Sequence, residues 1–185
     1  MAVKTFTSEI LTSSDTNTYL ANSGLVYVTS ATVGAGVASV TVPSAFNSTY
    51  DNYRIVWSGG TISSLALIAV YMGSSTGTGY YGTRLSATVA GVANSTGDNN
   101  ASLWTYATAG TTTTSPVSFD LFQPFASSRT HIDSLYSEVN GASSTFGRYV
   151  GYLNDTTSYT SFTIDPQGAV TMSGGTITVY GYRKP

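Results

Sequence analysis

From Leu25 onward, apolar, β-branched and aromatic residues recur in short runs separated by turn-forming residues, and they show no helical period. Gly34 and Gly36 separate the first two runs, and Pro43 ends the second because proline cannot donate a hydrogen bond to a strand ladder. The predicted strands are Leu25–Val28, Val37–Val42, Tyr53–Trp57, Leu65–Met72, Leu103–Ala107, Val117–Phe122, His131–Val139, Phe146–Leu153, Tyr159–Ile164 and Thr176–Tyr182. Because short strands at close spacing are typical of sandwiches and barrels, we predict an all-β fold, an antiparallel, jelly-roll-like β-sandwich over residues 25–185.

Residues 1–24 differ from the rest of the chain. Ser14 to Asn22 is predicted to form a helix of about two turns, preceded by N-cap side chains and closed by Gly24. So short a helix is marginal by itself, so we expect it to dock on another surface. We therefore predict an N-terminal attachment segment that contacts another subunit or another protein through Phe6, Ile10, Leu11, Tyr19 and Leu20.

Residues 73–102 are the least regular stretch, rich in Gly, Ser, Thr and Asn, with a turn expected at residues 97–100. Such stretches are typical of long surface loops, where binding is often located. Tyrosine and tryptophan combine apolar area with a polar tip and often anchor interfaces, whereas the alternative role is packing in the core or across strands. The tyrosines near strand ends or alternating along strands are Tyr80, Tyr81, Tyr106, Tyr149, Tyr152, Tyr159, Tyr180 and Tyr182. We predict that these loops, with Tyr80, Tyr81 and the nearby Trp104, form the contacts to a binding partner.

The composition indicates a folded β protein with few charges. Of 185 residues, 41% are hydrophobic and only 9% are charged, against roughly 25% in a typical soluble domain. The net charge is −2 and no run of Arg or Lys occurs, so nucleic acid is not an expected partner.

The longest apolar run, around residues 65–72, has the length of a strand, so membrane insertion is not expected. The first residues lack the apolar core of a signal peptide, so we expect the chain to be made in the cytoplasm.

The sequence offers little for catalysis or metal binding. His131 is the only histidine and the chain has no cysteine, which excludes an ordinary zinc site. Asp133 would share a strand face with His131, but no Gly-x-Ser-x-Gly elbow places a nucleophile. Residues 98–100 and 154–156 have oxygen ligands but do not match a calcium loop. We therefore predict no catalytic residue, no cofactor and no metal.

Carboxylates on or near predicted strands leave a glycoside hydrolase as an alternative, since that chemistry requires two suitably spaced acids. We expect these acids instead to solvate the surface or to pair with arginines. The acids are Asp120, Asp133, Glu138, Asp155 and Asp165, and the arginines are Arg54, Arg84, Arg129 and Arg148.

Two terminal motifs carry a family resemblance. Residues 4–17 (KTFTSEILTSSDTN) resemble the Phe-Thr-x-Gly-Glu-x-Leu-Thr-Ala-x-Asp-x-Asn start of many phage tail-fibre and virion proteins, with Ser8 in place of the usual glycine. Residues 174–183 (GGTITVYGYR) resemble the Gly-Gly-Thr-Ile-x-Val-Tyr-Gly-Tyr ending of phage structural proteins. Residues 50–55 (YDNYRI) and 120–125 (DLFQPF) also fit that group. The resemblance implies a bacteriophage virion protein and implies no catalytic residues.

On this basis we expect a non-enzymatic virion structural protein, a tail-fibre or receptor-binding component anchored through residues 1–24. Its expected partners are itself, as a homotrimer, other virion proteins, and a host surface glycan or protein. The alternative is a capsid decoration protein, either a cement protein or a head fibre. A carbohydrate-active enzyme is the third alternative, which unchanged glycan turnover in Asp120, Asp133 and Glu138 variants would exclude.

Overall fold

The computed structural model describes residues 24–74, 76–113, 115 and 117–184, and they form antiparallel sheets. One sheet has eight strands, and the first and the last strand in the sequence lie next to each other at one edge of it. In that order the strands are β1 (Leu25–Thr32), β14 (Thr176–Tyr182), β3 (Asn52–Ser58), β9 (Val117–Phe122), β10 (His131–Glu138), β11 (Thr145–Leu153), β6 (Tyr80–Thr88) and β7 (Ala93–Ala101).

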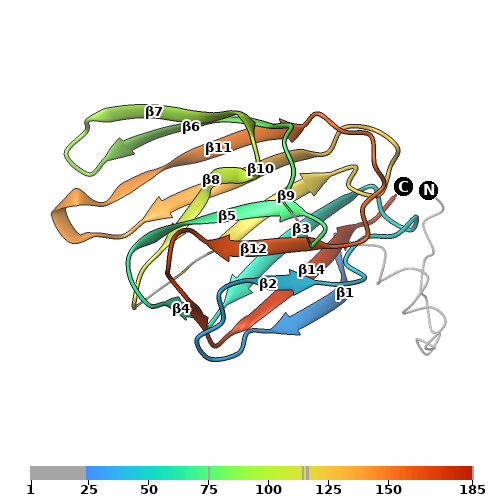
Figure 1. Cartoon of the computed structure of the whole chain (residues 1–185), viewed down its shortest axis with the longest axis horizontal. Helices are drawn as coiled ribbons and strands as arrows, with labels where there is room; N and C mark the ends of the chain where they lie inside the picture. Colours follow the sequence, from blue (N-terminus) through green and yellow to red (C-terminus); the bar gives the residue numbers. More distant parts are fainter. Residues whose placement is uncertain (1–23, 75, 114, 116, 185) are drawn as a thin grey trace, which may run out of the picture.

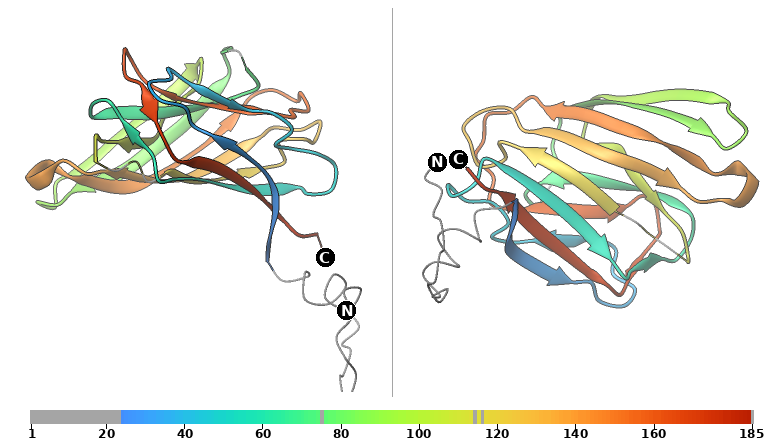
Figure 2. Two further views of the ribbon diagram at one scale, coloured as in Figure 1. Left: turned by 90° about the horizontal axis from the view of Figure 1, so that it is seen from below. Right: turned by 180° about the vertical axis from the view of Figure 1, so that it is seen from behind.

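A second sheet of four strands lies in front of the first in Figure 1 and covers part of its width. Its order is β2 (Val40–Val42), β12 (Phe162–Pro166), β5 (Ala66–Met72) and β8 (Trp104–Gly110). A small ladder of β4 (Thr61–Ile62) and β13 (Met172–Ser173) completes the sheets, and a short 3-10 turn spans Gly141–Ser143. The two layers are seen edge-on and from behind in Figure 2.

The strand order is that of a jelly roll with two added hairpins. Strands β1, β14, β3 and β9 form one four-stranded half, and β2, β12, β5 and β8 form the facing half, so the chain passes repeatedly between the two layers. Hairpin β6–β7 is inserted between β5 and β8, and hairpin β10–β11 between β9 and β12. Both hairpins add to the free side of β9, which widens one sheet to eight strands. The predicted jelly-roll-like sandwich is therefore confirmed.

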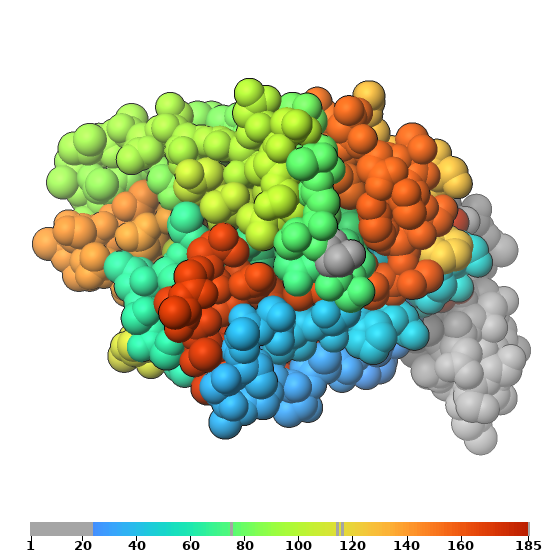
Figure 3. Space-filling view, viewed as in Figure 1, coloured from blue at the N-terminus to red at the C-terminus, as the bar shows by residue number. Residues whose placement is uncertain are grey.

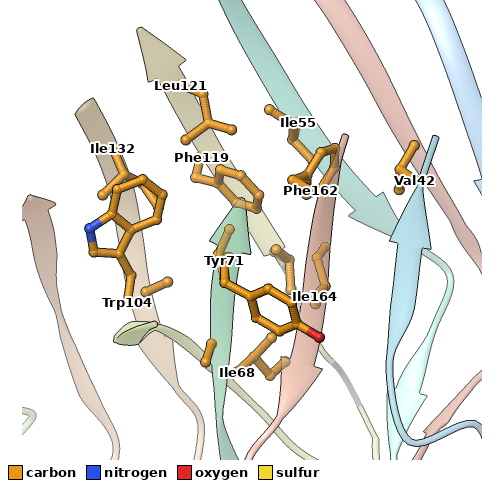
Figure 4. Close-up of a cluster of buried hydrophobic side chains, with 14 of the residues drawn as sticks. Val42, Ile55, Ile68, Tyr71, Trp104, Phe119, Leu121, Ile132, Phe162 and Ile164 are labelled. Atoms are coloured by element: carbon orange, nitrogen blue, oxygen red, sulfur yellow. The ribbon is translucent and has the colours of Figure 1, made fainter. Parts of the chain in front are cut away.

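Alternation along the strands places the core between the two layers. In β3 and β9 every second residue is buried, and β14 shows the same pattern. Figure 4 shows Phe119 and Ile55 from the larger sheet gathered with Phe162 and Val42 from the smaller one. The ring of Phe162 lies 5.9 Å from that of Phe119 and 5.6 Å from that of Phe46, and Phe162 has no exposed surface.

Several predicted strands are confirmed to within one residue at each end: Tyr53–Trp57, Leu65–Met72, Val117–Phe122, His131–Val139, Phe146–Leu153 and Thr176–Tyr182. Other boundaries move by more. The first strand runs on to Thr32, and the predicted strand Val37–Val42 shortens to β2, with Val37 forming an isolated bridge to Met172. The helix predicted at Ser14–Asn22 lies outside the described residues.

The prediction that residues 73–102 form long surface loops is wrong. They contain β6 and β7, and residues 97–100, expected as a turn, lie within β7. Strand β7 is the sheet's last strand and is exposed on both faces along most of its length, so it lacks the apolar alternation that reveals a strand. Residues 93–101 form a strand because their backbone pairs with β6, which pairs in turn with β11. Burial of apolar side chains contributes little to this strand.

Replacing Phe162 with alanine tests the inter-sheet core. We expect Phe162→Ala to lower the free energy of unfolding by about 3–5 kcal/mol, because it leaves a cavity beside two aromatic rings. Phe146→Ala, at a strand position that is 46% exposed, is the matched control and should cost less than about 1 kcal/mol. Urea unfolding measures both, and equal losses would contradict this assignment of the core.

Candidate functional site

The outward face of the eight-stranded sheet carries a row of aromatic rings. Register pairs Phe122 with His131, His131 with Tyr152, and Tyr152 with Tyr81, so the four rings come from neighbouring strands β9, β10, β11 and β6. The residue next to each along its strand is buried in the core, so the rings themselves project outward: Leu121, Ile132, Leu153 and Tyr80 are at most 3% exposed. We call Phe122, His131, Tyr152 and Tyr81 the ring row.

Contacts within the ring row hold the side chains close together. The rings of Tyr81 and Tyr152 are nearly parallel, with an interplanar angle of 12° and centroids 5.2 Å apart. The His131 ring lies 6.1 Å from Tyr152, and the Arg129 guanidinium is 5.7 Å from the Tyr152 centroid. Stacked and cation–π contacts of this kind stabilise an exposed aromatic cluster by modest amounts each.

Beside the ring row, the next register row carries polar side chains on β9, β10 and β6 and Val150 on β11, and we call it the polar row. It places Asp120 of β9 directly opposite Asp133 of β10, an arrangement of like charges that would be unfavourable by itself. Each carboxylate is paired to an arginine on its other flank, Asp120 to Arg54 and Asp133 to Arg148. These bidentate pairs confirm the arginine partners predicted for both acids. The hydroxyl of Tyr182 also donates to Asp120 at 2.8 Å, and the hydrogen bond to Asp120 raises the pKa of Arg54 above its usual range.

The two remaining arginines behave differently from the prediction. Arg129 donates to the side-chain oxygen of Asn154 at 2.9 Å. Arg84 is 9% exposed and lies over the ring of Tyr136 at 4.2 Å and that of Tyr106 at 5.4 Å. Neither arginine forms an ion pair with a carboxylate in the part of the chain that the structure describes. Buried aromatic faces take the place of an acid for Arg84.

A groove of about 770 Å³ lies along the ring row. The ring row and the polar row both line it, the latter through Asp133 together with Val150 and Thr83, and Asn99 contributes from β7. His131 also lines a neighbouring hollow, whose other members include Gln123, Ser128, Arg129, Asn154 and Asp155. The groove is thus an open concavity with aromatic and polar groups on it, a combination found in ligand sites.

Beneath the groove, the inner face of the sheet is unusually closely packed. The hydroxyl of Tyr149 donates to Asp98 at 2.7 Å, and Asp98 also accepts from the Thr105 backbone N–H at 2.9 Å. Burial, followed by the hydrogen bond to Asp98, raises the pKa of Tyr149 well above its usual range, so its hydroxyl stays protonated as a donor. Gly82 is required at this position because a Cβ there would overlap the Tyr149 hydroxyl. These contacts join β7 and β8 to the strands that carry the ring row.

Of the three residues predicted to contact a host surface, the structure leaves only Tyr81 on the outward face. Tyr80 and Trp104 are 3% and 0% exposed, and their rings meet edge to face at 5.0 Å, so their prediction as surface contacts is wrong. Adjacent residues of a strand point to opposite faces, so Tyr80 and Tyr81 cannot both be outward. The Tyr80 hydroxyl instead accepts a hydrogen bond from the Met72 backbone N–H at 2.8 Å.

Sequence reasoning did not single out Phe122, His131 and Tyr152 as binding residues, because only the register brings them together. In the sequence Tyr152 is not distinguishable from the other tyrosines on predicted strands, and His131 stands out only as a possible catalytic or metal-binding residue. The predicted attachment residues Phe6, Ile10, Leu11, Tyr19 and Leu20 lie outside the described residues.

Of the acids considered for hydrolysis, Asp120 and Asp133 lie directly opposite one another, and each is held in an ion pair with an arginine. Asp120 and Asp133 lie on the outward face in their ion pairs, whereas Glu138 follows Asp133 at odd spacing and accepts from the Tyr136 hydroxyl at 2.6 Å. Among the described residues, His131 forms no hydrogen bond to a serine or a carboxylate, and no group of three potential metal ligands occurs. In the same part of the chain no helix is long and apolar enough to cross a bilayer.

Comparison with known proteins does not extend this picture: no family model, no curated protein and no solved structure matches the chain.

Substitution of Gly82 tests the packing beneath the groove. We expect Gly82→Ala to lower the free energy of unfolding by about 1–3 kcal/mol, because the added methyl group must displace the buried Tyr149 ring. Gly77→Ala is the matched control, since a Cβ there meets nothing within 4 Å, and it should change stability by less than about 0.5 kcal/mol. The two variants are compared by urea unfolding. A neutral Gly82→Ala would show that the Tyr149–Asp98 contact does not constrain this part of the sheet.

Proposed function

We propose that this chain is a non-enzymatic structural protein of a bacteriophage virion, a tail-fibre or receptor-binding component that contacts the host surface through the groove. The groove along the ring row is the observation that carries this proposal. It combines an open concave shape, aromatic side chains and neutral polar groups on a rigid sheet, as binding surfaces commonly do. The virion location rests on the resemblance of the terminal motifs to phage structural proteins.

In this proposal residues 1–24 attach the protein to the particle. Strand β1 follows this attachment segment directly. Register places Leu25 opposite Tyr182, at the same end of the sheet as the ring row. Three strand steps separate Leu25 from Phe122, the nearest ring of the row, or about 14 Å at the usual strand spacing. A virion partner held near β1 would therefore leave the groove open to a host ligand.

Labelling of phage particles tests the proposed position. With antibody raised against the purified chain, we expect immunogold particles to cluster on the tail or its tip. Binding of the purified chain to host cells is expected to accompany this label, and pre-incubated chain should reduce adsorption of the phage. Label spread evenly over the head, without cell binding, would overturn the receptor-binding role.

Capsid decoration is the second candidate, and an exposed apolar surface favours it. Leu85, Leu135 and Phe146 lie on the outward face of β6, β10 and β11, on the part nearest the hairpin tips, and are 65%, 60% and 46% exposed. Leu85 and Leu135 flank Arg148 in one register row, and Phe146 is two residues along β11 from it. Clustered apolar side chains of this kind favour a protein contact.

We further propose that the chain assembles as a homotrimer within the virion. The eight-stranded sheet ends in β1 on one side and β7 on the other, and neither strand has a further partner among the described residues. Closed assembly is one way to cover such edges. Multi-angle light scattering of the full chain should give three times the chain mass of 19.3 kDa. A monodisperse monomer across the micromolar range would contradict the trimer.

A further inference from the structure

The side chains along the groove offer many uncharged hydrogen-bonding groups that are not used inside the protein. The hydroxyls of Tyr81, Tyr152 and Thr83 form no side-chain hydrogen bond within the described residues, nor do the His131 ring and the Asn99 amide. These groups are a mixture of donors and acceptors on aromatic or short side chains. By contrast, the carboxylates on the groove are already engaged, Asp98 by Tyr149 and Thr105 and Asp133 by Arg148.

The charge around the groove disfavours an anionic ligand. Its lining includes the carboxylates of Asp98 and Asp133 and neither lysine nor arginine. Arg148 neutralises Asp133 from the adjacent row. Arg129 lies in the neighbouring hollow, donates to the neutral Asn154 side chain and lies over the Tyr152 ring, outside the lining of the groove. An approaching carboxylate, sulfate or phosphate would therefore meet two carboxylates and no cation among the residues that line the groove.

The length of the ring row exceeds that of a single sugar ring. Its side chains come from four neighbouring strands, so the row extends about 14 Å across the sheet at the usual strand spacing. Polar groups flank it on both sides, with Thr83 and Asp133 on one and the hollow around Asn154 on the other. A ligand that follows the row would meet aromatic side chains, with hydrogen-bonding groups beside them at Thr83, Asn99 and His131.

We infer that the groove binds an uncharged oligosaccharide that lies across strands β9, β10, β11 and β6. Sugar C–H faces pack against Tyr152 and Tyr81, and sugar hydroxyls exchange hydrogen bonds with His131, Thr83 and Asn99. Tyrosine suits this ligand because it presents apolar area and a polar tip together. This inference rests on the proposed function, since it names the class of host ligand that the same surface takes.

Direct binding measurements with defined glycans test the ligand class. The full chain is applied to an array of mono- to hexasaccharides that contains neutral, sialylated, uronate and phosphorylated members. We expect binding to neutral oligosaccharides of three or more sugars, with neither monosaccharides nor acidic counterparts bound. Preference for acidic members, or no neutral oligosaccharide bound, would overturn the inference.

Variants of the ring row assign the binding to this groove. For the neutral oligosaccharide that binds best, we expect Tyr152→Ala and Tyr81→Ala each to weaken the affinity at least tenfold, because each removes an aromatic contact and a hydroxyl. Tyr27→Ala is the matched control, since Tyr27 is 59% exposed on β1 at the other side of the same sheet, and it should leave the affinity unchanged. Circular dichroism verifies that each variant is folded. Unchanged affinity in both ring-row variants would place the glycan elsewhere and overturn the inference.

Cell binding separates failure of this inference from failure of the proposed function. We expect binding of the wild-type chain to host cells to be abolished by periodate oxidation of the cells and to survive protease treatment. Binding that is protease-sensitive, periodate-resistant and reduced by Tyr152→Ala would exclude the glycan while the receptor-binding role stands. Absence of cell binding together with label on the phage head would exclude the receptor-binding role itself.

Discussion

Antiparallel register across β9, β10, β11 and β6 is the constraint from which both faces of the larger sheet follow. Because side chains alternate, a single alignment decides at once that Ile132 and Leu153 enter the core and that His131 and Tyr152 face outward. A shift of one residue in any of these strands would expose core side chains and bury the ring row. The free energy that selects the core alignment therefore also positions the groove, and the contacts within the ring row add only modest stabilisation.

The jelly roll supplies the layered core, and the two inserted hairpins supply the additional surface. Three of the four strands of the ring row, β10, β11 and β6, belong to the insertions, and only β9 belongs to the basic jelly-roll topology. The insertions are stabilised from beneath by close contacts such as the Tyr149–Asp98 hydrogen bond and the Arg84 guanidinium over Tyr136. The jelly-roll topology by itself therefore does not indicate a function. The surface that carries the ring row is formed mainly by the inserted strands.

The carboxylates on the outward face are neutralised by ion pairs with arginines. The register brings Asp120 and Asp133 directly opposite one another, and the arginines on either side, Arg54 and Arg148, compensate them. Such exposed pairs contribute little to stability. They occupy Arg54 and Arg148 in the rows beside the groove, and no lysine or arginine lines the groove itself.

The sequence by itself determined the all-β class and most strand positions, because alternation and turn residues act over a few neighbouring positions. It predicted arginines as partners of the surface acids in general, but only the structure shows that Asp120 pairs with Arg54 and Asp133 with Arg148. It did not determine the hairpin at residues 80–101, since β7 is exposed on both faces and shows no apolar period. Nor did it separate Tyr80 from Tyr81, or distinguish Trp104 as a core residue. The ring row joins residues 81, 122, 131 and 152, and only the pairing of strands distant in sequence makes them neighbours. Tertiary structure decides such a site because cross-strand register depends on the packing of the whole core, which no local pattern contains.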